Sequence, residues 1–248
     1  MATAAALLAF YRKDWVRIIR AFVSTVRTRR VETSAERLAW LLIVATVPVG
    51  LTGLALEHTF RTLFAKPLAA AVFLTVNGLI LLVGERLRRG SEVRQAAARR
   101  AAVSAGPGAV LEAGITAESG NRQLDTLSYR EAGVIGLFQT LALLAGISRS
   151  GITMVGGLLR GLDHEDAAKF SFLLATPVIL AAGLLKLPSL AGPAGAHIHG
   201  QVIVGFFTAA IAAYVAVRFL SRYFTTRTLT PFAVYCLLAG GASIIQFA

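Results

Sequence analysis

The chain has 248 residues, of which 56% are hydrophobic and 15% are charged, and its mean hydropathy is +0.67. These values exclude an ordinary soluble domain and favour a polytopic membrane protein. Its 25 Lys and Arg outnumber 13 Asp and Glu, but the positive charges cluster between apolar runs, so they predict cytoplasmic loops and no nucleic-acid partner.

The chain opens on an apolar run from Ala2 to Tyr11, which Arg12, Lys13 and Arg17 end. This run is about half as long as a membrane-spanning helix has to be. A signal peptide would carry its positive charges before the apolar run. We therefore interpret the run as the tail of a helix whose beginning lies upstream of Met1.

Five later segments have roughly the 20 apolar residues that a helix needs to cross a bilayer. The chain is thus predicted to be a single all-α membrane domain over residues 1–248, polytopic, with about five transmembrane helices. The only cysteine, Cys236, excludes disulfides and cysteine-based metal sites and is expected to pack. The predicted spans are 38–57, 66–85, 170–187, 200–220 and 229–248.

Basic residues indicate which connections are cytoplasmic. Arg12–Arg37 carries eight Lys and Arg, Arg86–Arg100 carries six, and Arg218–Arg227 carries three. We predict that all three segments are cytoplasmic. The stretch 91–130 is polar and contains a Gly-Pro-Gly breaker at 106–108, so it is predicted to be a cytoplasmic linker without a span.

Residues 132–159 contain a single charge, Arg149, and glycines and serines interrupt the apolar pattern near the midpoint. This pattern predicts two half-helices that form a re-entrant hairpin over residues 131–160. Non-helical backbone at membrane depth is tolerated only where protein or a water-filled cavity surrounds it. An ionisable residue in such a place is a functional hypothesis by default.

The residue types at this break suit a phosphorylated headgroup. A second half-helix that begins near Gly151 would direct its free N–H groups at the break, and Arg149 would add a planar fork of donors. Ser148, Ser150 and Thr153 supply hydroxyl groups beside them. An alternative stays open, in which Arg149 snorkels or pairs with a carboxylate and the serines cap a kinked helix.

Residues 145–153, which read Ala-Gly-Ile-Ser-Arg-Ser-Gly-Ile-Thr, resemble the Pro-Gly-x-Ser-Arg-Ser-Gly-x-Thr signature of the undecaprenyl-diphosphatases, the bacitracin-resistance phosphatases of cell-wall synthesis. Nearly the whole chain shares the resemblance. Ala145 stands where the family has proline, and the family's Glu-x-x-x-Glu and Pro-x-Ser-Ser-x-x-His motifs have no counterpart, so we expect them upstream of Met1. The other matching segments are 45–57, 126–132, 136–144 and 170–177.

This resemblance implies hydrolysis of undecaprenyl diphosphate to the monophosphate and inorganic phosphate, by a multi-pass protein of the bacterial cell membrane. It implies that Ser148, Arg149 and Thr153 contact the diphosphate as catalytic residues and that Ser150 and Gly151 bind substrate. It also implies a divalent cation, Mg²⁺ or Ca²⁺, whose acidic ligands are not in this chain. The partners it implies are a polyprenyl diphosphate lipid and the bilayer, and a homodimer stays open.

Four other polar features are predicted to be structural. Glu32 and Glu36 have the spacing of an acidic pair, but we expect them to cap a helix on the cytoplasmic side. The pair at 197–199, His-x-His, is expected in a solvated loop without metal, and 163–166 in a solvated first turn of a helix. Asn77 is expected to form an interhelical hydrogen bond, with a position facing the cavity as the alternative.

Two other functions stay open from the residues alone. Broken helices around an anion site at the membrane midplane also occur in transporters, so a transporter or a lipid flippase fits the interrupted segment. A non-catalytic paralogue that keeps the phosphate site fits it as well. Counting of basic residues predicts that the hairpin enters from the cytoplasmic side, whereas the resemblance implies that substrate arrives from the outer face.

Overall fold

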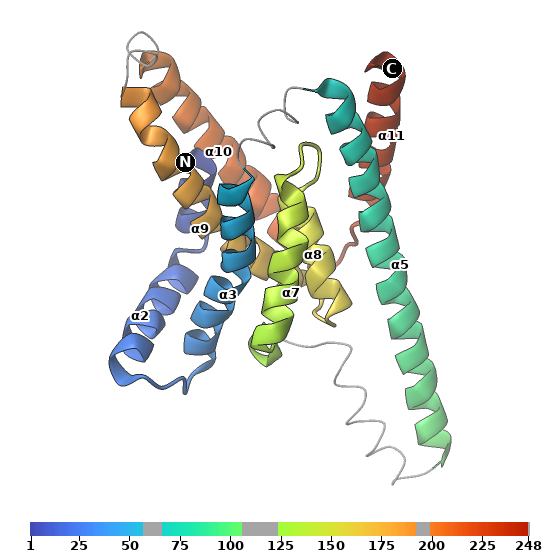
Figure 1. Ribbon diagram of the computed structural model, residues 1–248. Coiled ribbons are helices and arrows are strands. Elements are labelled where there is room, and N and C mark those ends of the chain that lie inside the picture. The colour runs from blue at the N-terminus through green and yellow to red at the C-terminus, as the bar shows by residue number, and fades with distance from the viewer. Residues whose placement is uncertain (57–65, 106–123, 192–198, 248) are drawn as a thin grey trace.

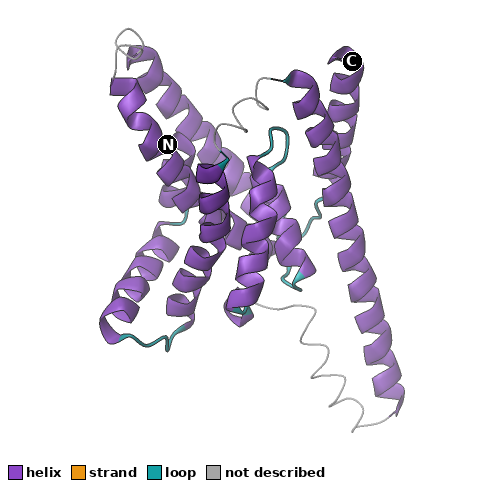
Figure 2. Cartoon of the chain, viewed as in Figure 1, coloured by secondary structure: helices purple, strands orange, loops and turns teal. Residues whose placement is uncertain are grey.

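The computed structural model describes residues 1–56, 66–105, 124–191 and 199–247. These ranges are helical apart from short connections and contain no strand (Figures 1 and 2). Two single 3₁₀ turns, η2 (Leu124–Thr126) and η3 (Leu141–Leu143), flank α7. The α-helices are α1 (Ala2–Phe10), α2 (Arg12–Thr28), α3 (Ser34–Ala55), α5 (Pro67–Ala105), α7 (Tyr129–Thr140), α8 (Arg149–Leu159), α9 (His164–Ala191), α10 (His199–Tyr223) and α11 (Thr230–Phe247).

Five of the described helices are long and apolar enough to cross a membrane. Each predicted span overlaps one of them, so the prediction of an all-α polytopic membrane protein with five transmembrane helices is confirmed. The crossing segments are Ser34–Ala55, Pro67–Gly90, His164–Leu185, Gly200–Tyr223 and Thr230–Phe247.

Reciprocal capping boxes begin α3 and α7. Thr33 Oγ1 accepts a hydrogen bond from the Glu36 amide at 3.3 Å, while Glu36 Oε2 accepts one from the Thr33 amide at 3.0 Å. Ser128 and Glu131 repeat this arrangement at the start of α7. Each box satisfies amides that have no acceptor within the helix. Glu36 therefore has the capping role that was predicted for it.

Two polar stretches that were predicted to be loops are helical instead. The basic segment after Tyr11 forms α2. Helix α5 has a total length of 39 residues and ends only at Ala105. The predicted linker over 91–130 contains no candidate span in its described part, but α5 extends into it as far as Ala105, and 106–123 lies outside the described residues. The reason is that Ala, Arg, Glu and Gln are strong helix formers, so a helix continues after its sequence has become too polar for the membrane.

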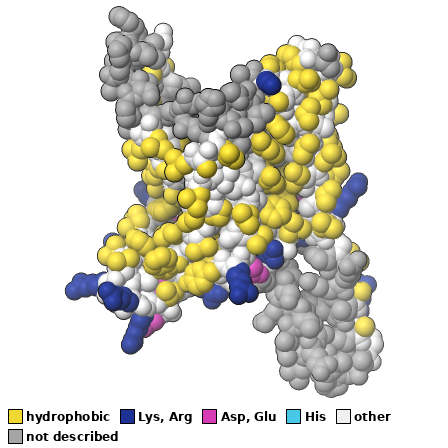
Figure 3. All heavy atoms as spheres, viewed as in Figure 1, with side chains coloured by type: hydrophobic (Ala, Val, Ile, Leu, Met, Phe, Trp, Pro, Cys, Tyr) yellow, Lys and Arg dark blue, Asp and Glu magenta, His cyan; other side chains and the backbone are white. Residues whose placement is uncertain are grey.

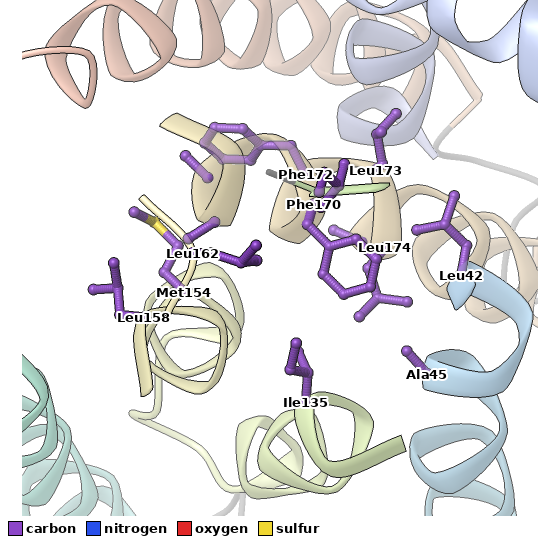
Figure 4. Packing of buried hydrophobic residues seen from close by; sticks show 14 of the residues in the cluster. Leu42, Ala45, Ile135, Met154, Leu158, Leu162, Phe170, Phe172, Leu173 and Leu174 are labelled. Atoms are coloured by element: carbon purple, nitrogen blue, oxygen red, sulfur yellow. The ribbon is translucent and has the colours of Figure 1, made fainter. Parts of the chain in front are cut away.

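The buried core lies where α8 and α9 meet α7 and α3 (Figure 4). All eight residues from Gly151 to Leu158 in α8 are buried. Ile135 of α7, Met154 of α8 and Phe170 and Leu174 of α9 point into the same cluster. The two short helices α7 and α8 are thus enclosed by the longer ones and form the centre of the molecule.

Basic side chains mark one end of the helices. Figure 3 shows most of the Lys and Arg side chains of the visible face in its lower part. The turn between α2 and α3, the end of α5 and the start of α7 lie there in Figure 1. The start of α7 therefore lies at the basic end of the helices, which is the end predicted to be cytoplasmic.

Close contact between α7 and α3 yields a first prediction. A Cβ atom at Gly136 would collide with the backbone oxygen of Ala45. Gly136→Ala should therefore destabilise the protein by about 1–3 kcal/mol, because the two helices would have to separate. Gly133→Ala is the matched control, since its Cβ would meet only the Val44 side chain at 3.9 Å.

Thermal unfolding in detergent would measure both variants of α7. The control should be neutral or slightly stabilising, because alanine favours a helix over glycine. Equal unfolding midpoints for Gly136→Ala and the unchanged protein would contradict the packing described here.

Candidate functional site

The pair α7–α8 forms a re-entrant hairpin. With 12 and 11 residues, the two helices are each about 17–18 Å long, whereas the hydrocarbon core is about 30 Å thick. Neither helix spans, and the chain reverses between Leu141 and Ser148. The predicted hairpin over 131–160 is confirmed, but α8 begins at Arg149, two residues before the expected start near Gly151.

The tip of the hairpin is held by α5. Gly146 has a φ of +102°, a left-handed conformation that favours glycine, and its added Cβ would collide with the backbone oxygen of Ala70. Asn77 Oδ1 accepts a hydrogen bond from the Ser148 amide at 3.1 Å, and Asn77 Nδ2 donates one to Cys236 Sγ of α11 at 3.3 Å. The predicted interhelical role of Asn77 and the packing role of Cys236 are therefore confirmed.

Ser148 is the N-cap of α8. Its Oγ accepts a hydrogen bond from the Gly151 amide at 3.2 Å and lies 3.5 Å from Ser150 Oγ, while its carbonyl accepts from the Ile152 amide at 2.9 Å. The capping alternative for this serine is thus observed. The amides of Arg149 and Ser150 precede the first intrahelical hydrogen bond, and they remain available to an anion at the positive end of the helix dipole.

Arg149 is half-buried beside this cap. No carboxylate or other side-chain partner of its guanidinium is found in the part of the chain that the structure describes. Thr153 is buried, and its Oγ1 donates to the Arg149 carbonyl at 2.8 Å. Ser171 Oγ of α9 donates to the Ser150 carbonyl at 3.1 Å. The first turn of α8 is therefore fixed on the protein side, while the guanidinium is left to meet a ligand.

A cavity of about 500 Å³ lies beside the hairpin tip. Asn77, Ser148, Ser150 and Gly151 give it a polar edge. Arg149 and Thr153 do not line this cavity, so the structure brings three of the five predicted site residues to it and leaves the other two outside its lining. The remaining lining residues are mostly apolar and are Leu74, Leu81, Gly146, Ile147, Met154, Phe172, Leu220, Phe224, Leu229, Phe232, Tyr235 and Cys236. A polar edge against apolar walls suits an amphiphile with a polar head.

One buried polar cluster was missed by the sequence analysis. Glu85 of α5 is 2% exposed, and its carboxylate contacts His164 Nε2 at 3.0 Å, Arg89 Nε at 3.2 Å and the Leu229 amide at 3.4 Å. A carboxylate inside a predicted span was the available signal, because such residues are rare and paired. The cluster ties α5 to α9 and to the start of α11, and we assign it no chemistry.

The prediction of a solvated turn at 163–166 is wrong for two of its residues. His164 packs against Glu85, and Asp166 Oδ2 accepts a hydrogen bond from the Leu124 amide at 2.8 Å. Asp163 Oδ1 accepts one from the Asp166 amide at 2.7 Å, as expected for a helix start. The histidine pair at 197–199 cannot be placed, because 192–198 lies outside the described residues and the side chain of His199 is not described.

Asn77 yields a second prediction, because it joins the hairpin tip to α11. Asn77→Ala should leave the partly buried Ser148 amide without this acceptor, at a cost of about 1 kcal/mol. Phosphate release should fall about tenfold or more, because the tip loses its fixed position. Cys236→Ser is the matched control, since serine can still accept from Asn77. A fully active Asn77→Ala protein would contradict this role.

The sequence of the chain is similar to a known protein family over almost its entire length. The family model described as "Bacitracin resistance protein BacA" matches residues 1–242. "Undecaprenyl-diphosphatase 2" of Frankia alni is 66% identical over 275 residues, which cover 100% of this chain and 80% of the relative. "Undecaprenyl-diphosphatase" of Mycolicibacterium paratuberculosis is 56% identical over 248 residues and is matched over 79% of its length by all of this chain.

More distant relatives retain the same coverage. "Undecaprenyl-diphosphatase 2" of Chromobacterium violaceum is 39% identical over 249 residues, which cover 99% of this chain and 79% of the relative. The match to these relatives thus extends over nearly the whole chain, far beyond the residues at the hairpin tip. The re-entrant hairpin, the five spans and the full-length match together show that the chain belongs to the BacA family of bacitracin resistance proteins.

Proposed function

We propose that this protein is an undecaprenyl-diphosphate phosphatase, which hydrolyses undecaprenyl diphosphate to undecaprenyl phosphate and inorganic phosphate. The observation that carries the proposal is Arg149, a half-buried guanidinium at the N-terminus of α8 without a side-chain partner in the described ranges. The names of the relatives support the reaction. The cavity beside the hairpin tip supports a substrate that joins an anionic head to an apolar chain.

Hydrolysis places negative charge on phosphoryl oxygens. A water oxygen forms a bond to the terminal phosphorus and loses a proton to solvent. The bond from that phosphorus to the bridging oxygen breaks, so the electron pair leaves with undecaprenyl phosphate. Arg149 can neutralise the terminal phosphoryl group with two parallel hydrogen bonds. The free amides at the start of α8 add hydrogen-bond donors that are already in position before charge develops on the phosphoryl oxygens. Ser148 holds this turn in place through its bond with Gly151.

The apolar walls of the cavity suit the prenyl chain. Leu81 of α5, Phe172 of α9 and Phe232 of α11 are among them, and they would bury isoprenoid carbons at about 25 cal/mol per Å². The head would then lie at the polar edge formed by Ser148 and Ser150. This division of the ligand explains why a diphosphate without a lipid should be a poor substrate.

We place the protein in the bacterial cell membrane, with the basic ends of its helices in the cytoplasm, as the clustering of Lys and Arg supports. Recycling of a carrier lipid for cell-wall synthesis is the process that consumes the product. A homodimer is part of the proposal as well, and single-molecule photobleaching in bilayers would count the copies.

A divalent cation, Mg²⁺ or Ca²⁺, also belongs to the proposal. Within the described ranges no group of three His, Cys, Asp or Glu side chains could hold a metal ion, so these residues do not fit a metal site and no step is assigned to a cation here. EDTA should nevertheless lower phosphate release by the purified protein, and Mg²⁺ or Ca²⁺ should restore it. Release that is unaffected by EDTA would contradict the cation.

Substitution of Arg149 tests the hydrolysis itself. Arg149→Ala should lower kcat/KM for undecaprenyl diphosphate about 100-fold, because charge-assisted hydrogen bonds worth about 3 kcal/mol are lost. Arg149→Lys should not restore the rate, since a point charge cannot reproduce the bidentate fork. Arg222→Ala is the matched control, because Arg222 is exposed at the end of α10.

The assay is release of inorganic phosphate, with thermal unfolding as a check of folding. Near-normal turnover by Arg149→Lys would contradict the role of the fork. Transport of the lipid without release of phosphate would favour a transporter or flippase, and binding without either would favour a non-catalytic paralogue.

A further inference from the structure

Helix α2 presents one face to the protein. Ile18, Ala21 and Thr25 are buried on this face, and Trp15 and Phe22 pack against the core beside them. The first turn is fixed further, because Asp14 pairs with Lys169 Nζ of α9 at 3.0 Å. In Figure 1, α2 lies beside the N-terminal half of α3. These contacts fix the rotation of α2 about its axis, and they therefore determine which of its side chains point away from the protein.

A second face of α2 is apolar and exposed. Val16, Ile19, Val23 and Val26 are 47%, 54%, 59% and 56% exposed. Their spacing of three, four and three residues places them in one stripe, roughly 120° around the helix from the buried face. An exposed aliphatic stripe in a chain with five membrane spans belongs in the acyl region of the bilayer.

A groove continues this apolar stripe toward α3. It has a volume of about 470 Å³ and runs between α2 and α3. Ile19 belongs to both the stripe and the groove, and Trp15 and Phe22 lie on the same side of α2. On α3 the groove is lined by apolar side chains such as Leu42 and Ile43. The groove has the shape and chemistry to take an acyl chain.

The third face of α2 is basic. Lys13, Arg17, Arg20 and Arg27 are exposed and follow one another at spacings of four, three and seven residues. This basic face lies roughly 100° beyond the apolar stripe and opposite the groove. Arg29 and Arg30 extend it past the end of the helix, and Figure 3 shows basic side chains gathered at this end of the molecule beside apolar ones.

We propose that α2 is an interfacial helix that binds anionic phospholipids of the cytoplasmic leaflet. Its apolar stripe and the α2–α3 groove take the acyl chains, and its basic face contacts the phosphodiester headgroups. Adjacent apolar and basic faces are what such a surface requires, and each basic side chain near an anionic membrane adds attraction. The proposal does not depend on the hydrolysis of a diphosphate.

The two tryptophans of the chain are built-in probes of this site. Trp15 lines the groove, and the Trp40 ring lies 5.7 Å from the Phe22 ring of α2. Bromine atoms on acyl chains quench nearby tryptophan fluorescence. The whole chain should therefore be reconstituted in phosphatidylcholine that contains equal fractions of either brominated phosphatidylglycerol or brominated phosphatidylcholine.

Brominated phosphatidylglycerol should quench with at least about fivefold higher apparent affinity, the effect of about one basic side chain. Lys13→Gln/Arg20→Gln/Arg27→Gln should abolish this preference. Arg218→Gln/Arg222→Gln/Arg227→Gln is the matched control, because it removes the same charge from exposed positions around the α10–α11 connection, and it should keep the preference. High salt should weaken the preference of the unchanged protein, a readout that needs no variant to fold.

Three results would overturn the proposal. Equal quenching by the two lipids in the unchanged protein would show that α2 has no preference for anionic lipid. A loss of preference in the control variant as large as in the α2 variant would show an effect of net charge alone. Absence of quenching by either lipid would show that a second copy or another protein covers α2.

Discussion

A backbone that leaves its helical hydrogen-bonding pattern at membrane depth has to find partners inside the protein, because hydrocarbon offers none. The connection between η3 and α8 is such a break, and the molecule is built around it. α3, α5 and α9 enclose the hairpin, and α8 is buried from Gly151 to Leu158. Asn77 supplies an acceptor for the Ser148 amide at the tip.

Enclosure of the hairpin demands close helix contacts, which glycine permits. Gly136 lets α7 touch the backbone of α3, and Gly84 of α5 lies against Val155 of α8, where an added Cβ would be 2.7 Å from Cγ1. Gly146 lets the tip reach α5. Packing between apolar helices in a membrane depends on such close approach, because the bilayer supplies little hydrophobic driving force. The position of Arg149 therefore depends on glycines both beside it in the sequence, at Gly146, and far from it, at Gly84.

The same constraint made the site readable from the sequence. Apolar runs of the right length predict the five spans. The glycines, serines and the arginine inside the apolar stretch 132–159 predict the break in the helix and its chemistry toward phosphate. The roles of Ser148, Arg149, Ser150, Gly151 and Thr153 toward substrate stay predictions. What the structure adds is that the Ser148 hydroxyl caps α8 and that the Thr153 hydroxyl is engaged within its own helix.

Other features depended on tertiary contacts and could not be predicted as readily. The pairing of Glu85 with His164 joins residues 79 positions apart, which no local pattern shows. Helix α2 was not predicted for another reason. Its many positive charges indicated a cytoplasmic loop, although its buried residues recur at helical spacing. α5 was predicted to end where its sequence becomes polar, whereas helix propensity carries it on to Ala105.

The central claim is that the N-terminus of α8 binds the diphosphate of a lipid. The most direct measurement is a structure of the protein in a lipid nanodisc with a polyprenyl methylene-diphosphonate, in which carbon replaces the bridging oxygen. We expect phosphonate oxygens within hydrogen-bond distance of the Arg149 guanidinium and the first amides of α8, with the prenyl chain along the apolar wall of the cavity. A phosphonate group bound elsewhere, with Arg149 turned away from it, would contradict the binding of the diphosphate at α8.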